Sequence, residues 1–342
     1  MTESAEISVC AATPLVTFGV LTDVQYADCE DKPAGYDPSL IRYYRNSLNQ
    51  VKHAFEHWSR MSGVSLVLQL GDLVDENNAS CEVGLERVLT LFSQLPVYHT
   101  VGNHELYNWD RHTLAEHYVC EGLVSKAEPV FYYSFVPVPG VRFVSLDCFE
   151  VSVLGYGAEH PRRHVAAELL AQKHGTWDES KWEWPDALSG LEQRFINSNG
   201  AVSQEQLLWL DGELRHADAA GEVVVVFGHL ALCPNSANPD CLLWNYAEVQ
   251  AVLETHPSST LYLCGHAHRC GYSTNGRGMH YMALAGIIET SPSTVAYSTI
   301  SVYQDRIEIH GAGREESRTL WFRTSEAPEE PLEVNPVVKV VV

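Results

Sequence analysis

Two kinds of hydrophobic pattern alternate along the chain. Short apolar runs rich in β-branched residues are typical of buried β-strands, and longer segments with apolar residues every three or four positions are typical of amphipathic helices. Strands are predicted at 15–21, 64–70, 97–101, 141–147, 223–227, 260–264 and 279–285, with a final hairpin at 296–303 and 306–311. Helices are predicted at 38–60, 80–94, 111–120, 163–173, 203–217 and 245–255. The alternation indicates an α/β fold.

The first predicted helix, 38–60, combines start signals with a regular apolar stripe. Asp37 is placed to cap it, and Pro38 suits its first turn. The stripe, which we interpret as facing the core, consists of Ile41, Tyr44, Leu48, Val51 and Phe55.

Two segments interrupt the pattern. Residues 150–200 are rich in Trp, His and Gly and have weak periodicity, so we interpret them as an insertion able to cover a site. Residues 325–342 are predicted to form a loosely held tail. Residues 1–324 contain no internal repeat and are predicted to form a single domain.

Charge and cysteine content exclude several classes of protein. The 342 residues include 44 acidic and 22 basic residues, giving a net charge of −22. This balance argues against nucleic-acid binding and against docking on anionic membranes. The nine cysteines are odd in number and form no C-x-x-C pair, which favours a reducing compartment and therefore a cytoplasmic location. Neither a secretory leader nor a membrane span is expected from the apolar runs.

Polar side chains follow five of the predicted strands, at the point where each strand ends. If these strands are parallel, their carboxyl ends share one edge of a sheet, where α/β proteins bind ligands. Each short motif alone is compatible with an ordinary turn, but all five together favour a metal centre. Two carboxylates, two carboxamides and three imidazoles suit two divalent ions of intermediate hardness, and a carboxylate can bridge them. These seven residues are Asp23, Gln25, Asp72, Asn103, His229, His266 and His268, and His104 follows Asn103 in the same motif.

The ordered set D-x-[HQ], G-D, G-N-H-[ED], G-H and G-H-x-H resembles the signature of calcineurin-like metallophosphoesterases, over roughly residues 15–315. The resemblance implies a four-layer α/β/β/α sandwich with two mixed β-sheets and a two-metal site at the strand ends. It implies that one metal is held by Asp23, Gln25, Asp72 and His268. It implies that the other is held by Asp72, Asn103, His229 and His266, with His104 over the phosphate as a catalytic residue.

Gln25 restricts the resemblance to one branch of the family, because most branches have His at this position. The segments "RYYRNSL", "LQLGDLVDENN", "TVGNHELYN", "SQEQLLWL", "CLLWNY" and "GIIET" are similar to the manganese-dependent ADP-ribose/CDP-alcohol diphosphatases. That branch implies two divalent ions, Mn²⁺ with Mg²⁺, Zn²⁺ or Fe as alternatives. It also implies hydrolysis of small nucleoside diphosphate compounds to AMP or CMP. We expect the protein to be a monomer. Arg269 and Cys270 depart from the branch, which has Asp-Gly at these positions, and leave the preferred substrate open.

Three residues are candidates for contacts with the organic part of the substrate. Tyr36 could stack on a base or be an ordinary surface aromatic residue. Cys241 could lie beside the base or ribose or be a small buried residue. Asn199 could shape a loop over the site or belong to a plain turn.

Three alternative functions are compatible with parts of this pattern. A cyclic-nucleotide phosphodiesterase of the same superfamily would favour His in place of Gln25. A purple acid phosphatase would have a tyrosine ligand where Asp75 stands. A non-catalytic scaffold on this fold would have lost metal ligands, whereas the full set is present here.

Overall fold

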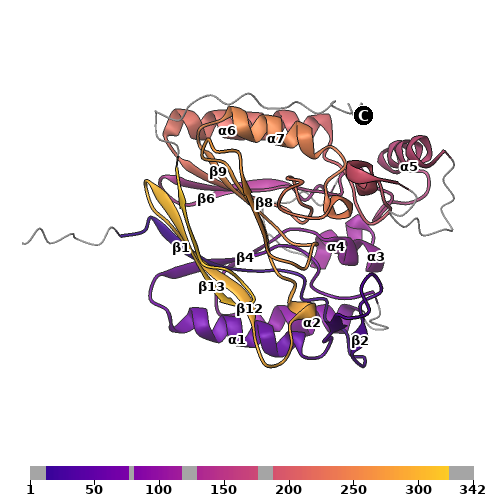
Figure 1. The fold of residues 1–342 in the computed structure, drawn as a ribbon, viewed down its shortest axis with the longest axis horizontal. Coiled ribbons are helices and arrows are strands. Elements are labelled where there is room, and N and C mark those ends of the chain that lie inside the picture. Colours follow the sequence, from indigo (N-terminus) through magenta and orange to yellow (C-terminus); the bar gives the residue numbers. More distant parts are fainter. Residues whose placement is uncertain (1–12, 77–80, 118–128, 176–187, 323–342) are drawn as a thin grey trace, which may run out of the picture.

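The computed structural model describes residues 13–76, 81–117, 129–175 and 188–322, and it has four layers. Two six-stranded sheets pack face to face, with helices on both outer sides (Figure 1). The predicted tail at 325–342 lies outside the described residues. Among those residues, every helix is too short or too polar to cross a membrane.

Both sheets are mixed, and their parallel strands point towards the same end of the molecule. In the first sheet, β1, β4 and β5 are parallel, and in the second β7, β8, β9 and β11 are parallel. The first sheet has the order β14 (Arg318–Trp321), β13 (Arg306–Gly313), β12 (Ala296–Val302), β1 (Val16–Leu21), β4 (Val64–Gln69) and β5 (Val97–His99). The second has the order β10 (Gly271–Thr274), β11 (His280–Ala283), β9 (Ser259–Cys264), β8 (Val223–Phe227), β7 (Val141–Ser145) and β6 (Tyr133–Val138).

Helices cover the outer faces and one end of the sandwich (Figure 1). The first sheet is covered by α1 (Ser47–Arg60) and α2 (Cys81–Leu91), and the second by α6 (Gln204–Ala220) and α7 (Tyr246–Thr255). Beside the ends of the parallel strands, at the right of Figure 1, lie α3 (Asn103–Asn108), α4 (Arg111–His117) and α5 (Pro161–His174).

Apolar side chains fill the space between the sheets and under the helices. Phe18 of β1 and Phe143 of β7 meet edge to face, with ring centroids 5.1 Å apart. On the outer face, α1 approaches so closely that a Cβ at Gly19 would lie 2.5 Å from the Trp58 ring. Glycine is therefore required at this point of β1. Trp58 also donates its indole N–H to Thr299 Oγ1 at 3.0 Å, so the polar end of this buried ring is satisfied.

The prediction of a helix over 38–60 is wrong for its first part, because α1 begins at Ser47. Residues 41–42 form β3 (Ile41–Arg42), which pairs with β2 (Lys32–Pro33). Asp37 caps no helix, since its carboxylate accepts from the backbone N–H of Ser39 at 3.0 Å. Tertiary contacts outweigh the helical periodicity here, because the Arg42 guanidinium lies beside the buried carboxylate of Asp75.

The segment at 150–200 is folded where the structure describes it. It contains α5 and a 3₁₀ turn, η2 (Gly190–Arg194), and residues 176–187 lie outside the described ranges. Its apolar side chains pack with Trp244 in a small separate core. That core consists of Val151, Val153, Ala166, Leu170, Phe195, Ala201 and Trp244.

Candidate metal centre

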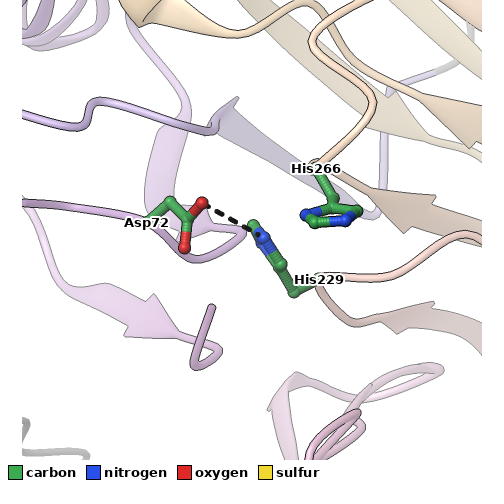
Figure 2. Close-up of side chains that lie close together, drawn as sticks. All are labelled: Asp72, His229 and His266. Carbon is green, nitrogen blue, oxygen red and sulfur yellow. Dashed lines mark ion pairs between the residues drawn. The ribbon is translucent and has the colours of Figure 1, made fainter. Parts of the chain in front are cut away.

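The loops after β1, β4, β5, β8 and β9 meet at the end of the sandwich and bring the predicted ligands together. Figure 2 shows Asp72, His229 and His266 pointing towards one another from three of these loops. One ligand atom from each of the three lies within 4.8 Å of the others. That separation is small enough for shared cations, so the predicted convergence is present in the fold.

Five of the predicted ligands have a left-handed backbone conformation. Among the described residues, every non-glycine residue with positive φ belongs to the predicted ligand set. Such a conformation costs about 1–3 kcal/mol per residue and persists only where the surroundings enforce it. Five of them together are comparable with the whole stability of a domain, about 5–15 kcal/mol. They are Asp23 (φ 50°), Gln25 (40°), Asp72 (60°), His266 (64°) and His268 (52°).

One half of the site is built around Gln25. Its Nε2 lies 3.0 Å from Asp72 Oδ2 and 3.0 Å from His268 Nε2. His268 Nε2 lies 3.3 Å from Asp23 Oδ1. Gln25 Oε1 is buried and has no hydrogen-bond partner, which is costly unless another group satisfies it. An oxygen-binding cation would satisfy it, so these four residues fit a metal.

The other half is built around His229. Its Nδ1 donates to the carbonyl of Leu70 at 2.7 Å, so Nε2 is the ring nitrogen that faces the site. Nε2 lies 3.1 Å from Asn103 Oδ1 and 3.4 Å from Asp72 Oδ2. The His266 ring centroid lies 5.1 Å from that of His229. Asp72 therefore contacts both halves, as a bridging ligand must.

Buried charges at the site compensate one another. Burial raises the pKa of Asp72, but the charges of His229 and His104 outweigh it and hold that pKa well below its usual range. Burial lowers the pKa of His229 and of His268, but Asp72 and Asp23 outweigh it and raise each pKa to about 9. The two imidazoles therefore hold protons at neutral pH, where a divalent cation would displace them and take over the charge compensation.

His104 is buried beside the ligand cluster. Its backbone N–H donates to Asp72 Oδ1 at 2.9 Å, and its Nε2 lies 3.9 Å from Asp72 Oδ2. On its other side, Nδ1 lies 3.4 Å from Asp75 Oδ2. Nε2 is therefore the ring nitrogen on the side of the ligands.

A pocket of about 530 Å³ opens over the cluster. Tyr36 and Cys241 line it, as do Ile196 and Ser198 of the 150–200 segment. Asn199 lies behind this wall. It is fully buried, and its Nδ2 donates to the carbonyls of Arg194 at 2.9 Å and Asp240 at 2.7 Å. Its side chain therefore shapes the loop, and the neighbouring Ser198 faces the pocket.

Residues 16–270 match the family model for calcineurin-like phosphoesterases. The chain belongs to this family. A "Manganese-dependent ADP-ribose/CDP-alcohol diphosphatase" of Mus musculus is 36% identical over 333 residues, 93% of this chain and 96% of that protein. The protein of the same name from Xenopus tropicalis is 36% identical over 336 residues, 91% of this chain and 95% of its own length. A dimetal phosphatase from Danio rerio, of known crystal structure, has a TM-score of 0.85 and 35% identity, covering 91% of this chain and 100% of that one. These likenesses confirm the predicted calcineurin-like fold.

Carboxylates that the sequence prediction did not select hold this calcineurin-like site in place. Glu105 accepts from the backbone N–H groups of Asp72 and Gly102, both at 2.8 Å, and so ties two ligand loops together. Burial and the charge of Asp72 raise the pKa of Glu105 to about 7. Glu289 accepts from His268 Nδ1 at 2.9 Å. Each of these carboxylates stands inside a motif quoted for the family resemblance, "GNHE" or "GIIET", and that was the available signal.

The two departures from the branch motif lie in different surroundings. Arg269 lines the pocket, and its guanidinium lies 3.3 Å from Asp37 Oδ2 in a largely exposed pair. Cys270 donates to the carbonyl of Arg314 at 3.2 Å. Arg269 therefore places a cation at the pocket wall, whereas Cys270 contacts the neighbouring loop.

Proposed function

We propose that this protein hydrolyses the diphosphate bond of ADP-ribose and of CDP-alcohols such as CDP-choline and CDP-glycerol. The products are a nucleoside monophosphate and a phosphorylated sugar or alcohol. The observation that carries the proposal is the convergence of the complete ligand set, with five members in left-handed backbone. The names of relatives at 36% identity over nearly the whole chain support this choice of substrate.

Two divalent cations are the cofactor of the proposed reaction. Asp23, Gln25, Asp72 and His268 would hold one, and Asp72, Asn103, His229 and His266 the other. Mn²⁺ suits this mixture of carboxylate, carboxamide and imidazole, and the relatives are named as manganese-dependent. When bound, the two cations lower the pKa of water and neutralise charge on the phosphoryl oxygens.

The chain's own side chains act on the substrate around this centre. His104 donates a hydrogen bond to the phosphoryl group or a proton to the leaving oxygen, with Asp75 holding its ring. Tyr36 and Cys241 line the part of the pocket that receives the base or ribose. Asn199 fixes the loop on which Ser198 lies, and this limits the shape of the pocket.

A substrate panel tests the proposal. ADP-ribose, CDP-choline, CDP-glycerol and cyclic AMP are compared with Mn²⁺ and with Mg²⁺, and the products are identified by mass spectrometry. The expected result is AMP or CMP from the diphosphates, with kcat/KM well above that for cyclic AMP. A preference for cyclic AMP would favour a cyclic-nucleotide phosphodiesterase. A protein that binds no metal and turns over none of these substrates would favour a non-catalytic scaffold.

Gln25→His is expected to shift the metal preference towards Zn²⁺ or Co²⁺ relative to Mn²⁺, on the order of tenfold or about 1.4 kcal/mol. The carboxamide oxygen is a neutral hard ligand, whereas imidazole favours later transition metals. Histidine tolerates left-handed backbone, so the variant keeps the φ of 40° at this position. Competitive metal binding is measured beside Gln304→His, a substitution in an exposed turn. An unchanged preference would show that Gln25 is not a ligand.

Tyr36→Ala is expected to weaken nucleotide substrates by about 1–3 kcal/mol, the magnitude of base stacking. The ring is 48% exposed at the pocket wall and has room for a base beside it. With Mn²⁺ saturating, turnover of a p-nitrophenyl phosphodiester, which carries no base, should be nearly intact. Equal losses on both substrates would mean that the change acts on the fold or the metals.

The proposed setting is a cytoplasmic monomer that acts on a small-molecule substrate, without nucleic acid or membrane as partner. The six cysteines whose side chains are described, Cys29, Cys148, Cys233, Cys241, Cys264 and Cys270, are free thiols. Free thiols favour a reducing compartment such as the cytoplasm. The net charge of −22 argues against nucleic acid as a partner.

A further inference from the structure

Glu289 connects the pocket wall to a candidate metal ligand. It ends a 3₁₀ turn, η4 (Ile287–Glu289), and its side chain has no exposed surface. Its Oε1 accepts from His268 Nδ1 at 2.9 Å and also from the hydroxyl of Tyr36. The Nε of Arg42 lies 4.0 Å from the same oxygen. One buried carboxylate oxygen thus gathers an imidazole, a phenol and a guanidinium.

The contact with Glu289 determines which nitrogen of His268 faces the cations. Since Nδ1 donates its proton to Glu289, Nε2 is the ring nitrogen that faces Gln25 and Asp23. The His268 backbone is left-handed, with φ of 52°, and Arg314 Nη2 donates to its carbonyl at 3.0 Å. The ring and the backbone of His268 are therefore held by separate partners.

The ring and the hydroxyl of Tyr36 make different contacts. Its ring lines the pocket and lies edge-on to the His268 ring, with centroids 6.5 Å apart. Its hydroxyl donates to Glu289. A stacking role requires only the ring, so the hydroxyl bond to Glu289 needs a different explanation.

We propose that Glu289 is a positioning residue for His268, and that the Tyr36 hydroxyl holds Glu289 in the position this requires. The inference rests on the proposed two-metal function and adds to it a link between the pocket wall and one cation. His229, in the other half of the site, is oriented by the Leu70 carbonyl and not by Glu289. The effect of Glu289 and Tyr36 is therefore confined to the cation that His268 holds.

Mn²⁺ binding to the metal-free protein tests the inference without using activity. Wild type, Tyr36→Phe, Glu289→Gln and Glu289→Ala are titrated with Mn²⁺, and free Mn²⁺ is followed by electron paramagnetic resonance. Tyr303→Phe is the matched control, because Tyr303 follows β12 at the opposite end of β1 from the site. Thermal melting of each metal-free variant reports on folding. Tyr36→Phe removes only a hydroxyl from a half-exposed ring, so it keeps the fold even if a Glu289 variant does not.

Glu289→Gln is expected to weaken one of the two Mn²⁺ sites by ~10–100-fold, the usual loss when the partner of a ligating histidine is changed. Tyr36→Phe should weaken the same site by ~3–10-fold, because it acts through Glu289. The other site and Tyr303→Phe should match wild type. In a Glu289→Ala background, Tyr36→Phe should cause no further loss, since its route to His268 is gone.

Three results would overturn the inference, in distinguishable ways. Two Mn²⁺ sites in wild type, with unchanged affinities in Tyr36→Phe and in the folded Glu289 variants, would overturn the positioning role alone. A full loss from Tyr36→Phe in the Glu289→Ala background would overturn the part of the inference in which the Tyr36 hydroxyl acts through Glu289. A wild-type protein that binds no Mn²⁺ would overturn the two-metal function and this inference with it.

Discussion

The Asp72→Ala variant is expected to bind less than the stoichiometric amount of metal per chain, and its kcat should fall by at least ~10³-fold. The reason is its position between the two halves of the site. Its Oδ2 lies 3.0 Å from Gln25 Nε2 and 3.4 Å from His229 Nε2, and the residue is 1% exposed. Removing this carboxylate takes a ligand from both cations at once. It also leaves the protonated imidazole of His229 in the buried site without the carboxylate that compensates it.

Asp72→Asn separates loss of charge from loss of shape. Asparagine is isosteric and tolerates left-handed backbone, so it fits the φ of 60° at this position. Metal per chain is measured by elemental analysis after dialysis, and kcat with saturating Mn²⁺. Asp305→Asn, in an exposed turn, is the control for a lost carboxylate. Two bound cations with near-normal kcat in Asp72→Ala would contradict the two-metal interpretation.

The convergence of the ligands was predictable because it depends on strand direction alone. Asp72 and His229 each follow a buried apolar run, and parallel strands deliver such residues to one end of a sandwich. The four-layer arrangement itself came from the family resemblance, since periodicity indicates only an α/β fold. The apolar runs of β1, β4, β8 and β9 were found within one residue of their observed bounds.

Elements with mixed exposure were not predictable in the same way. The strands β6, β10 and β14 lie at sheet edges, and their partly exposed residues give neither an apolar run nor a clean alternation. The pattern around Ile41 and Tyr44 fits a helix, but Tyr43 donates its backbone N–H to Ile288 at 2.7 Å, 245 residues away. No local pattern contains such a contact.

The carboxylates that support the candidate ligands were not predicted, for a related reason. Glu289 accepts a hydrogen bond from His268, which lies 21 residues earlier in the chain. The direction of the His268 ring also depends on its left-handed backbone, which cannot be predicted from the residue type. Aspartate and histidine are only modestly represented in left-handed backbone, and glutamine is not enriched there, so residue type alone does not reveal their φ. Ligand identity follows from residue type, whereas ligand orientation follows from these long-range contacts.

His104→Ala is expected to reduce hydrolysis of alkyl phosphodiesters by ~10²–10⁴-fold, the usual range for general acid–base catalysis. The loss for ADP-ribose should be much smaller. Its leaving group is a phosphate monoester with a second pKa of about 6, which departs at neutral pH with little protonation. An alkoxide is far more basic and needs a proton as it leaves. His104 is placed to supply one, since it lines the pocket beside Asp72 and its Nδ1 side faces Asp75.

A leaving-group series distinguishes this acid role of His104 from simple binding of phosphate. The logarithm of kcat/KM is plotted against leaving-group pKa for wild type and His104→Ala, with Mn²⁺ saturating. Loss of a general acid makes the variant's plot steeper. Without a proton donor, the free-energy cost of negative charge on the leaving oxygen rises with the basicity of that oxygen. If His104 only contacts the non-bridging oxygens, every substrate loses the same factor and the two plots run parallel. His112→Ala, an exposed histidine of α4 in the same part of the fold, should superimpose on wild type. Parallel plots would therefore exclude the acid role and leave His104 an electrostatic one.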